Sequence, residues 1–161
     1  KLVDATGNVP PAMIYESFNM LRPADQITAK VHLWDQMWND EFVKSYRMIG
    51  RWGRDILPLP GELFRQMTKE LMWDNKLVRG ELVLGGQRVD LRRIELPLLH
   101  VVAEHDHIVP YGAAKALVPM VGSTDKEELM LKGGHVSVAA GGNAVRRLWP
   151  KLDAWLGGRS T

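Results

Sequence analysis

The chain has 161 residues, of which 45% are hydrophobic and 25% charged, an ordinary composition for one globular domain. It contains no cysteine, which excludes disulfides and thiolate metal sites, and its 21 basic and 19 acidic residues are too balanced to indicate nucleic-acid binding. No apolar run approaches the roughly 18 residues of a membrane helix and the first residues do not resemble a signal peptide, so we expect a soluble, cytoplasmic protein without a membrane span.

The first half of the chain predicts helices. Residues 4–11 read as a loop, and residues 11–75 are rich in Trp and Met. Asn39 is the expected N-cap of one helix, and Pro60 lies near the first turn of another. Apolar residues recur at helical spacing, which favours helix packing over a ligand-binding function. The three apolar stripes are Ile27, Val31, Trp34 and Trp38; Phe42, Tyr46, Ile49 and Trp52; and Leu63, Met67 and Leu71.

The second half changes period. Residues 81–89 predict a small hairpin around a Gly-Gly turn. The apolar run 98–103 is typical of a strand buried in a parallel sheet, and His100 within it is interpreted as a core or edge histidine. A helix at 111–120 and a strand at 128–131 are expected next. The last helical face comprises Val145, Leu148, Leu152, Trp155 and Leu156, and Pro150 is expected to start or kink its final turns. Alternating strands and helices predict an α/β fold.

Polar residues follow both predicted strands of this half. Asp106 lies in the segment 104–110, and His135 follows two glycines in the segment 132–136. Because loops at the carboxyl ends of neighbouring parallel strands meet, we expect Asp106 and His135 to approach each other. A carboxylate in that position holds an imidazole in one tautomer and stabilises its protonated form. The alternative is a capping aspartate and an unrelated surface histidine.

A metal site is a second interpretation of the same segment. Glu104, His105, Asp106 and His107 are all residue types that bind zinc. However, the Ile-Val-Pro sequence that follows them indicates a turn, and no further ligand recurs at a useful spacing. The sequence therefore favours no metal.

Several segments together resemble a known family. They are 103–110 (Ala-Glu-His-Asp-His-Ile-Val-Pro) with Gly134-His135 placed 29 residues after Asp106 (135 minus 106), 6–10 (Thr-Gly-Asn-Val-Pro), 60–66 (Pro-Gly-Glu-Leu-Phe-Arg-Gln) and 75–83 (Asn-Lys-Leu-Val-Arg-Gly-Glu-Leu-Val). In this combination the chain resembles the C-terminal part of a polyhydroxyalkanoate (poly(3-hydroxybutyrate)) synthase, of the class III-type catalytic subunit, within the α/β-hydrolase superfamily. Ser137 departs from the pattern, since many relatives have a glycine near the histidine.

The resemblance implies a Cys–His–Asp triad that acts on hydroxyacyl-coenzyme A, with the cysteine on a Gly-x-Cys-x-Gly elbow. Asp106 and His135 match the acid and the histidine, and His107 would either line the site or structure the loop. The nucleophile is absent, because no Gly-x-Cys-x-Gly or Gly-x-Ser-x-Gly occurs in the chain. The five serines that stand in other contexts are Ser17, Ser45, Ser123, Ser137 and Ser160. We therefore expect a fragment of a synthase that is inactive by itself.

The resemblance also implies an organisation and partners. Residues 1–80 would form a helical cap, or lid, and residues 81–161 the C-terminal part of the hydrolase core. The substrate would be a 3-hydroxyacyl-CoA and the growing polyester, polymerised with release of CoA and without a cofactor. Expected protein partners are the missing N-terminal portion, a second copy in a homodimer and a second synthase subunit. The expected location is the cytoplasm, at the surface of polyester granules.

Two other functions remain open. The chain is alternatively part of another α/β-hydrolase, such as an esterase or a depolymerase, in which the nucleophile is serine. It is otherwise a non-catalytic module that uses the apolar first half for interaction. The nucleophile upstream distinguishes the first alternative from a synthase.

Overall fold

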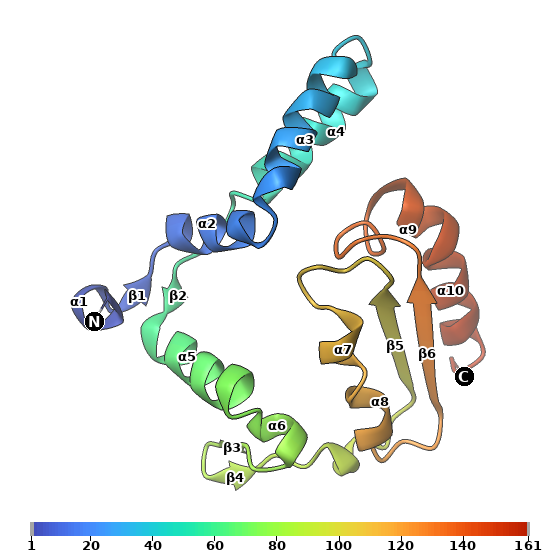
Figure 1. Ribbon diagram of the computed structural model, residues 1–161. Coiled ribbons are helices and arrows are strands. Elements are labelled where there is room, and N and C mark those ends of the chain that lie inside the picture. The colour runs from blue at the N-terminus through green and yellow to red at the C-terminus, as the bar shows by residue number, and fades with distance from the viewer. Residues whose placement is uncertain (1, 161) are drawn as a thin grey trace. The chain divides into compact units, whose positions relative to one another are not determined.

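The computed structural model describes residues 2–160 (Figure 1). The chain divides between Asp74 and Asn75 into two compact units, and each is described by itself. The first unit is mainly helical. The second combines short helices with small β-sheets, so the chain has the mixed helix-and-sheet composition that an α/β fold requires.

Short elements begin the first unit, where α1 (Leu2–Thr6) and β1 (Asn8–Val9) replace the loop expected over residues 4–11. That expectation is wrong because Gly7, at a φ of +71°, ends α1 with a hydrogen bond from its N–H to the Val3 carbonyl (2.8 Å). β1 pairs antiparallel with β2 (Leu59–Pro60). The Gly61 N–H then donates to the Gly7 carbonyl (2.9 Å). A Cβ at position 61 would lie 2.6 Å from the Gly7 carbonyl oxygen, so this close approach requires glycine.

Three helices follow in sequence: α2 (Pro11–Leu21), α3 (Pro23–Asp35) and α4 (Asp40–Trp52). The first two begin with proline, whose missing N–H costs nothing in a first turn. Asn39 caps α4 as predicted, because its side chain accepts a hydrogen bond from the Phe42 N–H (3.1 Å). α3 and α4 lie side by side as a helical hairpin (Figure 1).

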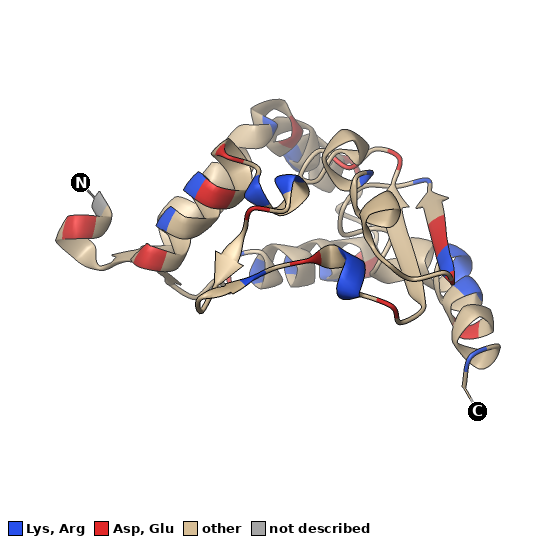
Figure 2. Cartoon of the chain, turned by 90° about the horizontal axis from the view of Figure 1, so that it is seen from below, with Lys and Arg blue, Asp and Glu red and all other residues tan. Residues whose placement is uncertain are grey.

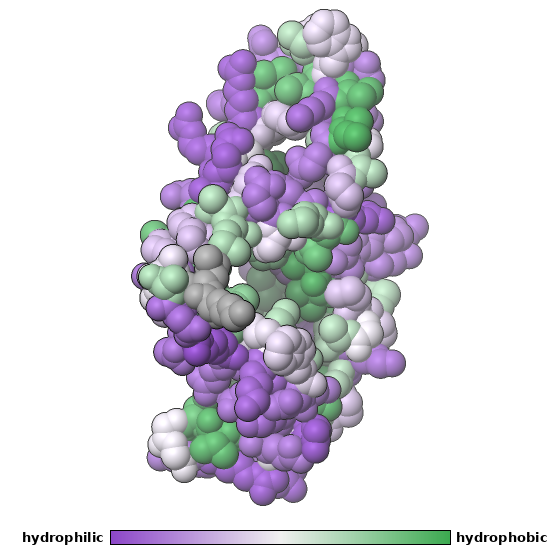
Figure 3. Space-filling view, turned by 60° about the vertical axis from the view of Figure 1, so that its left-hand side comes forward, coloured by the Kyte–Doolittle hydropathy of each residue, from purple (hydrophilic) through white to green (hydrophobic). Residues whose placement is uncertain are grey.

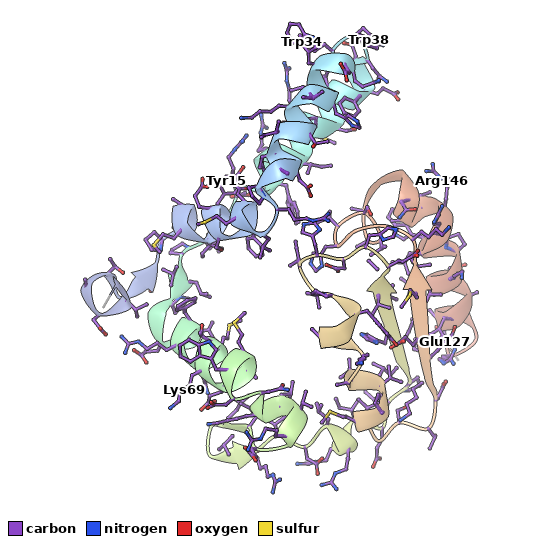
Figure 4. The ribbon with its side chains drawn as sticks, in the orientation of Figure 1. Tyr15, Trp34, Trp38, Lys69, Glu127 and Arg146 are labelled. Atoms are coloured by element: carbon purple, nitrogen blue, oxygen red, sulfur yellow. The ribbon has the colours of Figure 1, made fainter. Side chains whose placement is uncertain are left out.

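The apolar stripe of α3 lies at the surface. Ile27, Val31, Trp34 and Trp38 are between 52% and 76% exposed, so the packing interpretation is wrong for this stripe within the described chain. α3 also ends at Asp35, which leaves Trp38 in the following turn. Figure 4 shows Trp34 and Trp38 at the far end of the hairpin. Green hydrophobic patches interrupt the hydrophilic surface there in Figure 3.

The last helix of the unit changes its winding. α5 (Gly61–Gln66) continues directly into a π-helix, η1 (Met67–Trp73), which ends with a hydrogen bond from the Asp74 N–H to the Lys69 carbonyl (2.8 Å). A π-helix bonds each N–H to the carbonyl five residues earlier, so side chains rotate away from α-helical spacing. The stripe predicted through Leu71 therefore does not continue on one α-helical face.

The second unit opens with α6 (Lys76–Arg79) and the predicted hairpin, β3 (Val83–Leu84) with β4 (Gln87–Arg88). Gly85 and Gly86 connect these strands at φ values of +55° and +78°. Two successive positive φ values are the requirement of a type I′ turn, which glycine meets without strain. The 3₁₀-helix η2 (Leu91–Arg93) then leads to the main sheet.

That sheet is parallel, as predicted. β5 (Leu98–Ala103) pairs with β6 (Lys126–Leu131) from Leu98↔Lys126 to Ala103↔Leu131. The connection contains α7 (Tyr111–Ala114) and α8 (Leu117–Met120) where one helix was expected. Pro119 explains the break, because a proline ring clashes with the carbonyl four residues earlier, here that of Lys115. Figure 1 shows α7 and α8 on one side of the strands and the last two helices on the other.

The last helical segment consists of α9 (Gly141–Arg147) and α10 (Trp149–Gly157), and Pro150 lies in the first turn of α10, so it starts the final turns as predicted. A small apolar core lies between the sheet and this end of the chain. It contains Ala103, Leu131 and Val138, with Val101, Leu129 and Leu148 packed against it. Basic and acidic residues are distributed over both units (Figure 2). Within residues 2–160 no helix is long and apolar enough to span a membrane.

Candidate active site

Asp106 lies in the acid loop, which we define as residues 104–110 between β5 and α7. Its Oδ1 accepts hydrogen bonds from the backbone N–H groups of Ile108 (2.9 Å) and Val109 (2.8 Å). An aspartate that bonds to the backbone two and three residues ahead forms a local turn, which here carries the chain from the strand towards Pro110. The Asp106 side chain is 9% exposed and fixed within its own loop.

These contacts also set the charge of Asp106. Burial raises the pKa of its carboxyl group, whereas the hydrogen bonds from Val109, His135 and Ile108 lower it. The hydrogen bonds prevail, so the pKa lies below its ordinary value. Asp106 is therefore a carboxylate at neutral pH.

His135 lies in the loop that follows β6, and glycine makes its approach possible. Gly133 has a φ of +143°, and a Cβ there would lie 2.6 Å from Ser137 Oγ and 2.7 Å from Asn143 Nδ2. The Gly134 N–H donates to Ser137 Oγ (2.8 Å), so the serine that stands where many relatives have glycine stabilises the turn. The Asn143 side chain donates to the Lys132 carbonyl (2.9 Å) and closes the loop from α9.

The structure brings Asp106 and His135 together across the ends of the two strands. Asp106 Oδ2 lies 2.8 Å from His135 Nδ1. Since an ionised carboxylate only accepts, Nδ1 is the donor, and in the neutral imidazole Nε2 then carries the lone pair. The His135 side chain is 42% exposed. The arrangement suits an imidazole that takes a proton at Nε2 while its new charge is stabilised from behind.

A cavity of about 360 Å³ adjoins this pair within the second unit. Asp106, His135 and His100 are its polar lining residues. Its apolar lining comes from β5, from the acid loop and α7, and from the segment after His135. Those residues are Val101, Val102, Ala103, Val109, Ala114, Val138, Ala139 and Leu148. An apolar cavity with a few convergent polar groups is the usual form of a small-molecule site.

The other candidates lie differently. His107 is exposed and is not among the residues that line this cavity. His105 is also exposed, and its N–H donates to the Gly133 carbonyl (3.0 Å). Among the described residues no group of three or more His, Asp or Glu side chains could hold a metal ion. We therefore propose no metal site in the segment from Glu104 to His107.

The described serines do not supply a nucleophile for His135. Ser123 is buried and its hydroxyl bonds to the Asp125 backbone. Ser137, two residues from His135, bonds to the Gly134 backbone. Neither these nor the other described serines form a hydrogen bond with His135 in residues 2–160.

Sequence reasoning missed the backbone donors to Asp106 and the role of Asn143. The Asp106 donors have a signal, because aspartate shortly before proline often bonds to the backbone of the turn that it starts. Asn143 has none, since its contact with Lys132 depends on where α9 packs.

No protein-family model matches the chain. Individual proteins do match it along almost its whole length. The chain is 35% identical to the poly(3-hydroxyalkanoate) polymerase subunit PhaC of Allochromatium vinosum, covering 98% of this chain and 44% of that protein. It is 33% identical to the Thiocystis violacea subunit of the same name, over 98% of this chain and 45% of the relative. With the Haloferax mediterranei subunit it shares 32% identity, over 99% of this chain and 32% of the relative.

These matches confirm the resemblance to polyhydroxyalkanoate synthases. The chain spans between about a third and less than half of the length of these curated relatives.

Proposed function

We propose that this chain is the part of a polyhydroxyalkanoate synthase that supplies the acid and the histidine of its catalytic triad. The complete enzyme would be an acyltransferase that polymerises 3-hydroxyacyl-CoA and releases CoA, and its nucleophilic cysteine would lie outside these 161 residues. The observation that carries the proposal is the 2.8 Å contact between Asp106 and His135, made by loops that follow adjacent parallel strands. The similarity to proteins named as poly(3-hydroxyalkanoate) polymerases supports the proposed substrate class.

In the proposed mechanism His135 Nε2 takes the proton of the cysteine thiol. The thiolate attacks the thioester carbonyl of the hydroxyacyl-CoA, a new enzyme thioester forms, and the CoA thiolate leaves with the proton that His135 returns. Asp106 holds the imidazole and stabilises its positive charge. In the next step His135 or Asp106 accepts the proton of an incoming hydroxyl group, which attacks the enzyme thioester. The ester bond forms, the bond between the acyl carbon and the cysteine sulfur breaks, and the cysteine leaves as a thiolate that takes the proton back. No cofactor takes part.

The fold supports placing the chain in an α/β-hydrolase core. β5, the α7–α8 connection, β6 and the helices α9 and α10 would be its final strands and helices. The acid after one strand and the histidine after the next follow the chain order of α/β-hydrolases. Residues 81–161 would then form the core and residues 1–80 the lid.

The apolar surface of the first unit supports a lid that handles an apolar product. Large hydrophobic side chains on α3 and α4 are exposed (Figure 3). Such a surface suits the passage of substrate and polyester or the covering of the lid by a partner. We place the enzyme in the cytoplasm, at the surface of polyester granules, with a second copy and a second synthase subunit as further partners.

The test uses the complete protein and its 161-residue part. The complete protein should contain a Gly-x-Cys-x-Gly elbow and form a cysteine-linked acyl-enzyme from hydroxybutyryl-CoA, detected by mass spectrometry. The 161-residue chain should release no CoA from the same substrate. A serine at the elbow with ester hydrolysis would instead indicate an esterase or a depolymerase, and CoA release by the chain alone would refute the proposal.

A further inference from the structure

A second polar network joins the three elements around the acid loop. The Tyr111 hydroxyl donates to Glu128 Oε1 (2.7 Å), and Glu128 Oε2 lies 3.0 Å from His100 Nδ1. His100 and Glu128 are register partners on β5 and β6, whereas Tyr111 is the first residue of α7. The His100 and Glu128 side chains are 13% and 25% exposed. At such partial burial the contact between His100 and Glu128 is better shielded from water than a surface pair, whereas Tyr111 is 38% exposed.

Glu128 is well suited to connect both neighbours. The hydrogen bond from Tyr111 and the contact with His100 lower the pKa of its carboxyl group against the effect of burial. It is therefore a carboxylate at neutral pH, with one oxygen for each neighbour. Bonds to an ionised acceptor are stronger than those between neutral groups.

The network lies where the acid loop ends. The loop begins at Glu104, whose N–H donates to the Leu131 carbonyl of β6 (2.9 Å), and the next N–H, of His105, donates to Gly133 (3.0 Å). Tyr111 directly follows the other end of the loop. Both ends are thus held by β6 or by the turn after it, the same segment that carries His135.

We propose that Tyr111 and Glu128 are positioning residues that hold the acid loop so that Asp106 faces His135. Fixing the end of the loop at Tyr111 fixes the N–H groups of Ile108 and Val109, which hold Asp106 Oδ1 and leave Oδ2 for the imidazole. His100 holds Glu128 from β5. The catalytic meaning of this inference rests on the proposed function, but the geometry that it concerns is measurable without substrate.

The test compares Tyr111→Phe and Glu128→Gln with Glu127→Gln in this chain. Phenylalanine removes one hydroxyl, and glutamine removes the negative charge, so the contacts with Tyr111 and His100 are no longer made to an ionised acceptor. Glu127 is the matched control, because it is the adjacent carboxylate of β6, is exposed, and projects from the strand as Figure 4 shows. Hydrogen exchange of the Val109 amide should become about tenfold faster in the first two variants, as expected when a hydrogen bond to a charged group is weakened. Glu127→Gln should leave it unchanged.

A second readout is the carboxyl group of Asp106, followed by carbon NMR during acid titration. Its pKa should rise in Tyr111→Phe and Glu128→Gln, because the loop N–H groups then stabilise the carboxylate less. Unchanged exchange and titration in a Tyr111→Phe chain with native circular dichroism would overturn the inference. Equal changes in Glu127→Gln would also overturn it, since they would indicate general loosening of β6. In the complete enzyme kcat should fall with little change in KM, and absence of synthase activity would refute the proposed function without altering the two readouts.

Discussion

At the scale of single residues, Asp106 divides its two oxygens between structure and chemistry. Oδ1 accepts hydrogen bonds from two backbone N–H groups of its own loop, and Oδ2 accepts one from His135. The loop therefore fixes the carboxylate before it meets the imidazole, and little orientation has to be gained during a reaction. This division distinguishes the contribution of Asp106 from that of His135, whose Nε2 faces the reacting groups in the proposed mechanism.

We predict different failures for the two residues in the complete enzyme. His135→Ala should slow acylation of the cysteine by about 10²–10⁴-fold or more, because the thiol keeps its proton at neutral pH. Asp106→Asn should permit slow acylation and impair chain elongation, through a wrong tautomer or loss of hydroxyl activation. Acyl-enzyme formation and chain growth are measured separately after loading with a hydroxyacyl-CoA.

His107→Ala provides the comparison within the same loop. It should be milder than either change, since His107 is exposed and does not line the cavity. Near-normal acylation by His135→Ala would show that another group is the base.

Asp106 should also make stability depend on acid. Its folded-state pKa is lowered, so its ionised form stabilises the folded chain above the ordinary aspartate value of about 3.9. As the pH falls through the folded-state value, that contribution is lost. The difference in unfolding free energy between the natural chain and Asp106→Asn, from urea titrations, should shrink as the pH falls below about 4. A difference that does not shrink in that acid range would contradict the assignment.

At the scale of the elements, the histidine turn depends on one glycine. Gly133→Ala should lower the unfolding free energy by about 1–3 kcal/mol, because alanine is strained at a φ of +143° and its Cβ would overlap Ser137 and Asn143. Denaturant unfolding of the chain measures this loss.

The neighbouring glycine is the matched control. A Cβ at Gly134 would have its nearest neighbour, the His105 carbonyl oxygen, at 3.8 Å, and its φ is not positive. Gly134→Ala should therefore cause no comparable loss. Similar losses at both positions would mean that the turn tolerates neither side chain for a reason other than backbone strain.

Elements with a local cause could be predicted from the sequence. β5, the hairpin at Gly85-Gly86 and the cap at Asn39 depend on residues within or beside the element. The break at Pro150 has a local cause and was predicted, whereas the break at Pro119 also has a local cause but is concealed because the apolar periodicity continues across it. The π-helix Met67–Trp73 has no comparable signal, because the spacing of residues in the sequence does not indicate the change to hydrogen bonds five residues apart.

The candidate site follows the same division. The approach of Asp106 to His135 follows from parallel pairing, which strand patterns predict. The polar network of Tyr111 and Glu128 cannot be predicted from strand patterns, because it depends on the register of β5 and β6 and on the direction of α7. Exposure of the α3 stripe was missed since periodicity identifies an apolar face without identifying what covers it.

At the scale of the whole molecule, the two units differ in how they use apolar residues. The second buries a small core around Ala103, Leu131 and Val138. In the first, among the described residues, large side chains of α3 and α4 are exposed instead. Exposed apolar patches usually mark an interaction site.

We therefore predict that the chain self-associates through α3 and α4. Trp34→Ser combined with Trp38→Ser should shift the chain towards monomer, because both side chains are at least 75% exposed on one hairpin. Sedimentation velocity over a range of concentrations measures the shift.

Trp73→Ser is the control, since Trp73 is 78% exposed but lies outside the hairpin. It should leave association unchanged. A natural chain that stays monomeric at high concentration would contradict the prediction, and so would equal effects of the control.

Parallel pairing also determines when the site first exists during synthesis. Asp106 precedes His135 by 29 residues, and the strand that positions His135 is made after the acid loop is complete. At about 5–20 residues per second, a ribosome needs about 1.5–6 s to synthesise that interval. Closing a short loop takes well under a millisecond. The rate of translation, and not diffusion of the chain, therefore determines when Asp106 and His135 come together. Slow codons between β5 and β6 would lengthen the period in which the acid loop has been synthesised but β6 has not.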